Sequence, residues 1–318
     1  MDGLTLFEKA LERLREKFTA WKKTLAVEAG VELEDVDAML ANRNERVISA
    51  LYRLTGYGGK ALLANTSVKK MISVVIESGA KSKRLFFVVA FTGAGKTYTS
   101  QAVVQNLSDE YSVGYVRVTE MNGRSRLSLW NDIARAFPQM HVFRDGDRIG
   151  SLVYTRVRDM FKNTHGVIVI DEAQKLSDKN LESLRDLFDT TDVSLVFMAS
   201  SQFYERMSVE RLDNNDFGQF LRRADDKYIL AHATPGDVKA YLSLYGVSLE
   251  DGEYKIISKM VSKHGDIDTL ARSIRRIASL HDEGKLKWSK VKAGDIFDAI
   301  NRVMQVQRID NNSLEEAA

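Results

Sequence analysis

A glycine-rich turn that ends in lysine and threonine carries the clearest chemical signal in the sequence. Residues 90–97 read AFTGAGKT, which matches the phosphate-binding pattern G-x-x-x-x-G-K-[ST] except that Ala90 replaces the first glycine. Glycines let backbone N–H groups turn inward around phosphate oxygens, and the helical pattern that follows adds the positive end of a helix. Lys96 would reach the β- and γ-phosphates of ATP, and the Thr97 hydroxyl would ligate Mg²⁺. The residues expected to hold the nucleotide are Ala90, Phe91, Thr92, Gly93, Ala94, Gly95, Lys96, Thr97 and Tyr98.

An acidic pair at the end of an apolar run supplies the other half of this chemistry. VIVIDEAQ, residues 167–174, leads through four apolar residues into Asp171 and Glu172. In a sheet that carries a phosphate loop, we expect Asp171 to hold Mg²⁺ and Glu172 to activate the attacking water as general base. Ser200 ends another apolar run, where a polar side chain could sense the γ-phosphate. The alternatives are a chance Gly-Lys-Thr turn, an ordinary strand-end carboxylate pair and a strand cap.

Apolar runs of strand length supply the frame that these residues need. They cover residues 84–90, 113–119, 166–171 and 194–200, and helical patterns lie between them. Strands that are buried on both faces and alternate with helices indicate a parallel α/β sheet. The sequence thus predicts an α/β fold in which the phosphate loop and the acidic pair each follow a strand.

Both ends of the chain show helical periodicity instead. Apolar residues recur at spacings of three and four from Leu4 to Leu14, and they recur again at helical spacing after residue 232. Between the first helical region and the strands, residues 55–67 read TGYGGKALLANTS, which is typical of a linker. We expect an all-helical domain, an α/β core and a small helical lid, over residues 1–60, 61–232 and 233–318.

Composition excludes several classes of protein. The sequence has no cysteine, which excludes disulfides, cysteine nucleophiles and thiolate metal sites and suits a reducing cytosol. A hydrophobic content of 44% is enough for a buried core, whereas no apolar run reaches the roughly 18 residues of a membrane span. The formal net charge is +2, so any attraction to nucleic acid must come from a local arrangement of charge.

A helix-turn-helix pattern occupies residues 22–43. Ala26, Gly30 and Val36 have the types and spacing that let two helices cross, permit a left-handed turn and fill the junction. The second helix would present carboxylates, which phosphate repels. These carboxylates belong to Glu32, Glu34, Asp35 and Asp37, and the cations left for DNA phosphates are Lys22, Lys23 and Arg43. The alternative is a helical module that docks another protein.

Phosphate loop, acidic strand, polar sensor strand and helical lid together resemble the AAA+ ATPases. The resemblance implies self-assembly into rings or spirals, in which an arginine of one subunit enters the nucleotide site of the next. Arg222 and Arg223 precede an apparent edge strand, where the family usually places that arginine. Relatives often carry a lid arginine at the place of Asp268, so Arg272, one turn later, is the candidate for the lid sensor.

The order of a helix-turn-helix, a AAA+ core and a short lid resembles the phage Mu B-type transposition ATPases, relatives of the Tn7-like and IS21-like target selectors. The stretches that carry this resemblance are LAVEAGVELEDVDAMLANRNERV, AFTGAGKT and DEAQKLS. It implies a cytoplasmic protein of a bacterium or phage-infected host that binds double-stranded DNA with ATP, largely without sequence preference, polymerises on it and activates a transposase. Arg124 and Arg126 lie in a glycine-containing stretch after the 113–119 strand, predicted as a loop. Because that loop often faces the channel in AAA+ rings that engage DNA, both are candidates for DNA backbone contacts.

Two other functions remain open on the sequence alone. One is a replication ATPase of the helicase-loader type, which its partner would distinguish. The other is an ATP-gated helix-turn-helix transcriptional regulator, which would protect one symmetric site on DNA. The acidic second helix argues against the regulator.

Overall fold

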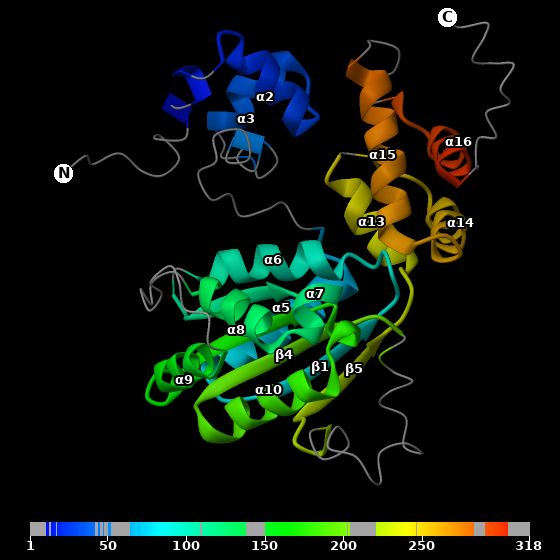
Figure 1. Ribbon diagram of the computed structural model, residues 1–318. Helices are drawn as coiled ribbons and strands as arrows, with labels where there is room; N and C mark the ends of the chain where they lie inside the picture. The colour runs from blue at the N-terminus through cyan, green and yellow to red at the C-terminus, as the bar shows by residue number, and fades with distance from the viewer. Residues whose placement is uncertain are drawn as a thin grey trace, which may run out of the picture.

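The computed structural model describes most of the chain, and Figure 1 shows its course. The described residues are 11–12, 14–16, 18–41, 44, 47, 50–51, 64–108, 110–137, 150–201, 203, 221–245, 247–282 and 290–304. Arg43 and residues 55–63 of the predicted linker lie outside them. Within the described ranges, no helix is both long enough and apolar enough to cross a membrane.

A parallel sheet of five strands forms the centre of the fold, which confirms the predicted α/β class. The strands are β1 (Leu85–Ala90), β2 (Val113–Arg117), β3 (Gly166–Asp171), β4 (Val193–Ala199) and β5 (Asp226–Leu230). Their order is β2-β3-β4-β1-β5, so β4 lies between the strand before the phosphate loop and the strand that ends in the acidic pair. Because the strands are parallel, the segments that follow β1, β3 and β4 lie together at the carboxyl end of the sheet.

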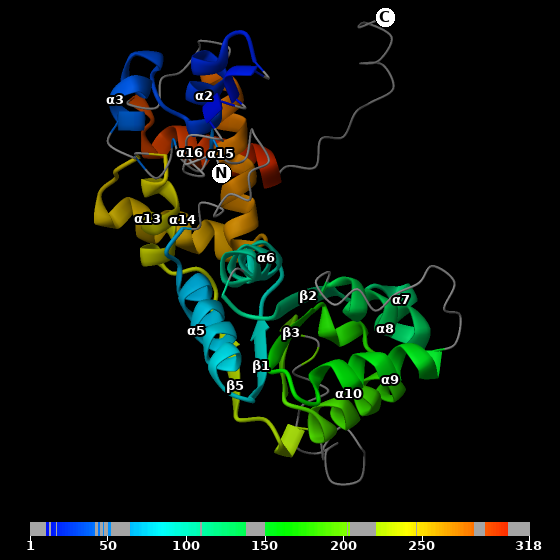
Figure 2. The ribbon, with the colours of Figure 1, turned by 90° about the vertical axis from the view of Figure 1, so that its left-hand side faces the viewer.

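Helices cover both faces of the sheet (Figure 2), and this explains why its strands are continuously apolar. On one face, Phe86 and Val88 pack against two helices, α5 (Ser67–Lys81) and α6 (Lys96–Leu107). On the other face, Phe87 packs in a cluster that includes residues of three further helices. These are α8 (Arg126–Arg135), α9 (Gly150–Phe161) and α10 (Asp178–Thr190).

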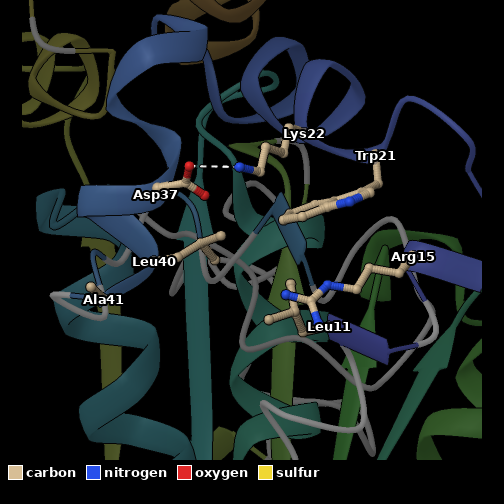
Figure 3. Close-up of a pocket in the computed structure, with 7 residues that line it drawn as sticks. All are labelled: Leu11, Arg15, Trp21, Lys22, Asp37, Leu40 and Ala41. Atoms are coloured by element: carbon tan, nitrogen blue, oxygen red, sulfur yellow. Dashed lines mark hydrogen bonds and ion pairs between the residues drawn. The ribbon is translucent and has the colours of Figure 1, made fainter.

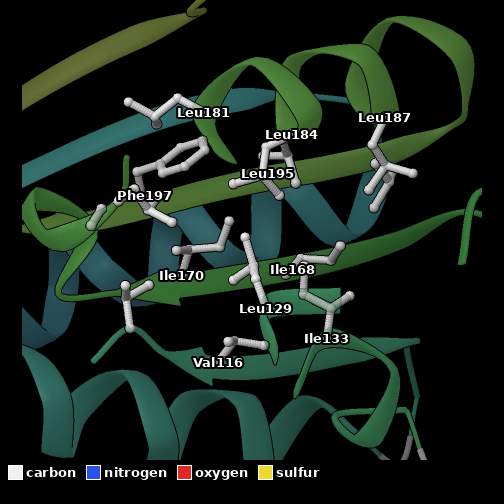
Figure 4. Packing of buried hydrophobic residues seen from close by; sticks show 14 of the residues in the cluster. Val116, Leu129, Ile133, Ile168, Ile170, Leu181, Leu184, Leu187, Leu195 and Phe197 are labelled. Carbon is white, nitrogen blue, oxygen red and sulfur yellow. The ribbon is translucent and has the colours of Figure 1, made fainter. Parts of the chain in front are cut away.

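Helix α10 packs on β4, the strand that leads into the polar sensor. Leu181, Leu184 and Leu187 recur every three residues and form one buried stripe. Figure 4 shows this stripe against β4, with side chains of β3 in the same cluster. Each fully buried leucine contributes about 1.5–3 kcal/mol relative to an exposed one, so the stripe stabilises the packing of α10 on β4.

Helices also make up the described part of the chain after β5, as predicted for a lid. They are α13 (Pro235–Ser243), α14 (Asp251–Ser262), α15 (Asp266–Asp282) and α16 (Ala293–Met304). The predicted periodic residues Leu270, Ile274 and Ile277 are buried in an apolar cluster that these helices share.

The N-terminal helical pattern is confirmed in type but not in the extent of its second helix. Helix α2 (Trp21–Ala29) ends at Gly30, whose φ of 63° is the predicted left-handed turn. The second helix, α3, covers only Val36–Ala41, because Glu32 is extended and Leu33–Asp35 form a 3₁₀ turn. Of the four carboxylates assigned to the second helix, only that of Asp37 lies on α3.

One carboxylate joins the lid to the core. Asp237, in the first turn of α13, accepts hydrogen bonds from the N–H of Ser67 at 2.6 Å and from its hydroxyl at 3.0 Å. It also accepts from the N–H of Thr234 at 2.8 Å and from its hydroxyl at 2.7 Å. Asp237 therefore ties the first turn of α5 to the first turn of α13.

Replacing Asp237 with Asn should destabilise the protein in a pH-dependent way. Burial by itself would raise the pKa of Asp237, but the hydrogen bonds from Ser67 and Thr234 outweigh it and lower the pKa below 3.8. A carboxyl with a lowered folded-state pKa stabilises the fold above its unfolded pKa, and this contribution disappears as the pH falls through the folded pKa. We expect a loss of about 1–3 kcal/mol in the free energy of unfolding at pH 7, and a smaller difference from wild type below about pH 4.

Urea unfolding at several pH values measures this effect. Asp298→Asn, at an exposed carboxylate of α16 in the same lid, is the matched control and should behave as wild type throughout. A difference between D237N and wild type that stays constant as the pH falls would contradict the assigned role of the carboxylate.

Candidate nucleotide-binding site

The glycine-rich turn between β1 and α6 has the geometry of an anion cradle. Gly93 and Gly95 have φ values of 84° and 90°, which residues with side chains rarely adopt. Gly95 is the N-cap of α6 and offers no side-chain cap, so the first N–H groups of that helix remain for a ligand. A turn of this kind at a helix N-terminus fits the phosphates of a nucleotide.

Lys96 lies buried beside this turn. Its Nζ donates to the carbonyl of Ala90 at 2.7 Å and to the carbonyl of Phe91 at 3.0 Å. Burial lowers the pKa of Lys96, while the charges of Asp171, Glu172 and Asp266 act in the opposite direction. The ammonium group is therefore held over the loop by acceptors that phosphate oxygens could replace.

Thr97 and Asp171, the residues predicted to hold Mg²⁺, meet directly. The Thr97 hydroxyl donates to Oδ2 of Asp171 at 2.6 Å, and the N–H of Glu172 donates to Oδ1 at 2.9 Å. A hydroxyl and a carboxylate are oxygen ligands of the kind that Mg²⁺ prefers. The residues present therefore fit a magnesium ion bound together with the nucleotide phosphates.

Tyr115 is a member of the site that the sequence did not indicate. Its hydroxyl donates to Oδ2 of Asp171 at 2.7 Å from the neighbouring strand β2. Burial and the adjacent carboxylate raise the pKa of Tyr115, so the phenol stays protonated and orients Asp171. A single tyrosine in the apolar run VGYVR was the available signal, but only the strand register reveals its partner.

Glu172, the predicted general base, is held by its own turn. Its φ of 59° is left-handed, and Oε2 accepts from the amide of Gln174 at 2.9 Å and pairs with Nζ of Lys175 at 3.0 Å. Gln174 also accepts from the N–H of Ser200 at 3.1 Å, so it bridges the acidic pair and the end of β4. The Ser200 hydroxyl is buried and has no hydrogen-bond partner in the part of the chain that the structure describes, which leaves it available to a ligand.

The lid touches the phosphate loop through the start of α15. The N–H of Asp268 donates to the carbonyl of Gly93 at 2.9 Å, and a side chain on Gly93 would collide with the carbonyl of Gly265. The ring of Phe91 stacks on His232 at 3.6 Å between centroids, and His232 in turn contacts Asp266 at 3.0 Å. His232 and Asp266 are further contacts that sequence reasoning missed.

The predicted arginines fall in different places. Arg272 lies on α15 one turn after Asp268 and pairs with it at 3.1 Å, and Asp268 in turn contacts the phosphate loop. Arg222 and Arg223 precede β5, whose first residue pairs with Phe86 near the amino end of β1. They therefore lie near the amino ends of the strands, whereas Lys96 follows the carboxyl end of β1. Arg223 pairs with Asp189 at 2.9 Å. A role for either arginine in a neighbouring subunit remains a prediction.

The loop predicted around Arg124 and Arg126 is wrong, because this segment is helical. Thr119 caps α7 (Glu120–Arg124) through a capping box with Asn122, and Ser125 caps α8. Gly123, which suggested a loop, instead lets α7 pack against backbone, since a side chain there would lie 2.4 Å from the carbonyl of Lys175. Both arginines are exposed, and Arg124 forms an exposed pair with Glu120 at 3.3 Å.

Of the predicted N-terminal cations, Lys22 borders a pocket of about 570 Å³, shown in Figure 3. Lys22 pairs with Asp37 of α3 at 2.6 Å, and the guanidinium of Arg15 lies 5.1 Å from the ring centroid of Trp21. Lys23 is exposed. The pairing of Lys22 with Asp37 reduces the charge that this surface offers to phosphate.

Comparison with known proteins relates the chain to one class of ATPase. A family model described as an AAA domain matches residues 79–207. The ATP-dependent target DNA activator B of Escherichia phage Mu is 24% identical over 83% of this chain and 84% of its own length. The Mu-like prophage FluMu DNA transposition protein B of Haemophilus influenzae is 22% identical over 85% of this chain and 95% of its own length.

Solved structures give the same fold. Cdc6p of Pyrobaculum aerophilum has a TM-score of 0.53 at 13% identity and covers 77% of this chain and 68% of its own. The Aeropyrum pernix ORC2 protein, solved in ADPNP–ADP complexes, has a TM-score of 0.54 at 12% identity and covers 78% and 69%. The chain thus has an AAA+ P-loop fold, and it resembles the Mu B-type proteins over most of its length.

Proposed function

We propose that this chain, whose AAA domain and sequence relate it to the target DNA activators of Mu-like phages, is an ATPase that activates a transposase on target DNA. In the ATP state it binds double-stranded DNA largely without sequence preference and assembles along it, in the cytoplasm of a bacterium or of a phage-infected host. The observation that carries the proposal is the meeting of Thr97 with Asp171 beside Glu172 and the phosphate loop.

The chemistry follows from the arrangement of these side chains. The phosphate loop and the α6 N-terminus would bind the phosphates, and Lys96 would turn from two carbonyls to the β- and γ-oxygens. Thr97 and Asp171 would hold Mg²⁺, which supplies positive charge to the phosphates when it is bound. Glu172 would accept the proton of the attacking water, and the free Ser200 hydroxyl would contact the γ-phosphate.

Assembly on DNA would use a head-to-tail interface between copies of the chain. Arg222 or Arg223 would then enter the site of the next subunit, and Arg272 would act from the lid. A helicase loader or a transcriptional regulator finds no specific support, since the likeness to Cdc6p and ORC2 extends to the fold alone.

The exposed surface of α7 and the start of α8 would contact DNA phosphates. Replacing Arg124 and Arg126 with Ala should weaken DNA binding in ATP by about threefold to tenfold each, and each should reduce the slope of log affinity against log salt by about one. Fluorescence anisotropy with random-sequence duplex DNA over a salt series measures both quantities.

Arg135→Ala is the matched control for this test. Arg135 is also an exposed arginine of α8 and pairs with Asp132 of the same helix at 3.3 Å, but it lies at the opposite end of α8. Equal losses for Arg135→Ala and Arg124→Ala would show that general charge, and not the α7 surface, is responsible. An unchanged salt slope in the Arg124→Ala, Arg126→Ala double variant would exclude this surface from the DNA interface.

A further inference from the structure

The carboxylate of Asp171 has most of its hydrogen-bonding capacity filled by the protein itself. Oδ2 accepts from the hydroxyl of Thr97 at 2.6 Å and from the hydroxyl of Tyr115 at 2.7 Å, and Oδ1 accepts from the N–H of Glu172 at 2.9 Å. An ionised carboxylate has about four lone-pair sites. Since these three donors fill one site each, a single site, on Oδ1, remains for a metal ion or for a water bound to the ion.

The two hydroxyls on Oδ2 differ in what they leave for a metal. A hydroxyl has one hydrogen and two lone pairs, so Thr97, beside the phosphate loop, can bind Mg²⁺ through its oxygen while its hydrogen stays on Asp171. The hydroxyl of Tyr115 approaches from the strand on the other side, β2, and it also hydrogen-bonds to the side chain of Gln101. Tyr115 therefore fills a lone pair of Asp171 without standing at the phosphate loop itself.

The position of Tyr115 is fixed by the sheet and by α6. In the register of β2 on β3, Tyr115 lies opposite Val169, and Asp171 is two residues further along β3 on the same face. The ring of Tyr115 packs against the apolar cluster that α5 and α6 share with the sheet. Because Gln101 of α6 holds the hydroxyl as well, the bond from Tyr115 to Asp171 is a constrained contact.

The number of free lone pairs on a carboxylate matters differently to different cations. Mg²⁺ keeps several of its waters and needs one or two carboxylates besides the phosphates of a nucleotide. Ca²⁺ takes about six to eight oxygen ligands and often binds both oxygens of one carboxylate. With Oδ2 closed by two hydroxyls, Asp171 offers one contact, which suits Mg²⁺ and leaves Ca²⁺ short of ligands.

We propose that Tyr115 is a positioning residue that sets the metal selectivity of the site: it restricts Asp171 to one metal contact, so that the site selects Mg²⁺ over Ca²⁺. This inference rests on the proposed function, because it takes ATP with a divalent cation as the ligand of the site. Tyr115 acts through Asp171, and its hydroxyl is the group that matters.

Titration of the full-length protein with a fluorescent, non-hydrolysable ATP analogue, at saturating Mg²⁺ or saturating Ca²⁺, tests the proposal. The wild-type protein should bind the analogue more tightly with Mg²⁺ than with Ca²⁺. Y115F keeps the ring and removes the hydroxyl, so the ratio of the dissociation constant with Ca²⁺ to that with Mg²⁺ should fall by about threefold to tenfold. Ca²⁺ should also inhibit Mg²⁺-dependent ATP hydrolysis by Y115F at a correspondingly lower concentration.

Tyr111→Phe is the matched control, since Tyr111 is another partly buried tyrosine that packs against the same apolar cluster. It should keep the wild-type ratio. An unchanged ratio in Y115F would overturn the proposal. An equal loss of affinity with both cations would also overturn it, because that is the effect of a purely structural tyrosine.

The wild-type protein alone gives a further test that does not depend on the folding of a variant. Equal affinity for the analogue with Ca²⁺ and with Mg²⁺ would overturn the proposal and leave the proposed function standing. A wild-type protein that binds no analogue with either cation would overturn the proposed function together with this inference.

Discussion

Replacing Glu172 with Gln should lower kcat for ATP hydrolysis by about 10²–10⁴-fold while leaving the affinity for ATP close to that of wild type. The substitution keeps the shape of the side chain but removes the group that accepts the proton of the attacking water. In the described residues Glu172 makes no hydrogen bond or ion pair with the phosphate loop. Its charge acts on Lys96 together with the charges of Asp171 and Asp266, so its removal alone should change the affinity for nucleotide little. The variant should therefore accumulate in the ATP-bound state.

Single-turnover and steady-state hydrolysis, together with titration of a fluorescent ATP analogue, separate the two effects. Glu110→Gln removes an exposed carboxylate after α6 and should leave both quantities unchanged. A variant E172Q that hydrolyses ATP within about tenfold of wild type would contradict the assignment of the general base.

Replacing Lys96 with Ala should weaken ATP binding by about 10- to 150-fold, since a hydrogen bond to a charged group is worth about 1.5–3 kcal/mol. The same variant should lose the effect of ATP on DNA binding. The reason is local, because Nζ of Lys96 lies over the loop on the carbonyls of Ala90 and Phe91, where the phosphates are expected.

The K96A variant should keep its fold, which makes the loss specific. Alanine removes a buried charge together with its desolvation cost, and the two carbonyls can bond to water that enters the turn. Lys70→Ala, at an exposed lysine of α5, is the control for general loss of positive charge. ATP affinity equal to that of wild type in K96A would remove the phosphate loop from the account.

The parts of the fold that the sequence predicted have local causes. The strands β1 to β4 are contiguous or nearly contiguous apolar runs of strand length between helical patterns, as expected for strands that are buried on both faces. The loop chemistry of Gly93, Gly95 and Lys96 depends on neighbours in the chain. Because Asp171 and Glu172 lie where β3 ends, a parallel sheet is sufficient to place them at the same end of the sheet as the phosphate loop, which follows β1.

The features that could not be predicted depend on contacts between distant segments. The bond from Tyr115 to Asp171 requires the register of β2 on β3, which one sequence does not contain. Gly123 suggested a loop because its packing partner, the backbone of Lys175, is far away in the sequence. The residues next to Gly123 do not reveal that contact. The pairs of Lys22 with Asp37 and of Arg223 with Asp189 have the same origin.

The N-terminal pair of helices combines a local feature with one that depends on the surrounding chain. The spacing of Ala26, Gly30 and Val36 predicted the left-handed turn correctly, because a turn is a local property. The prediction that the second helix presents four carboxylates was wrong, since Glu32 is extended, a 3₁₀ turn follows it and α3 begins only at Val36. A pattern that fixes the crossing of two helices therefore did not fix which carboxylates the second helix displays.

Electron microscopy of the protein with random-sequence duplex DNA tests the central claim, an ATP-switched assembly on DNA, most directly. Wild-type protein should form filaments or open spirals along the DNA with ATP, and it should leave the DNA bare with ADP or without nucleotide. The K96A variant should leave the DNA bare even with ATP, whereas E172Q should form assemblies that persist. Discrete particles that are the same with ATP, with ADP and without nucleotide would contradict the account.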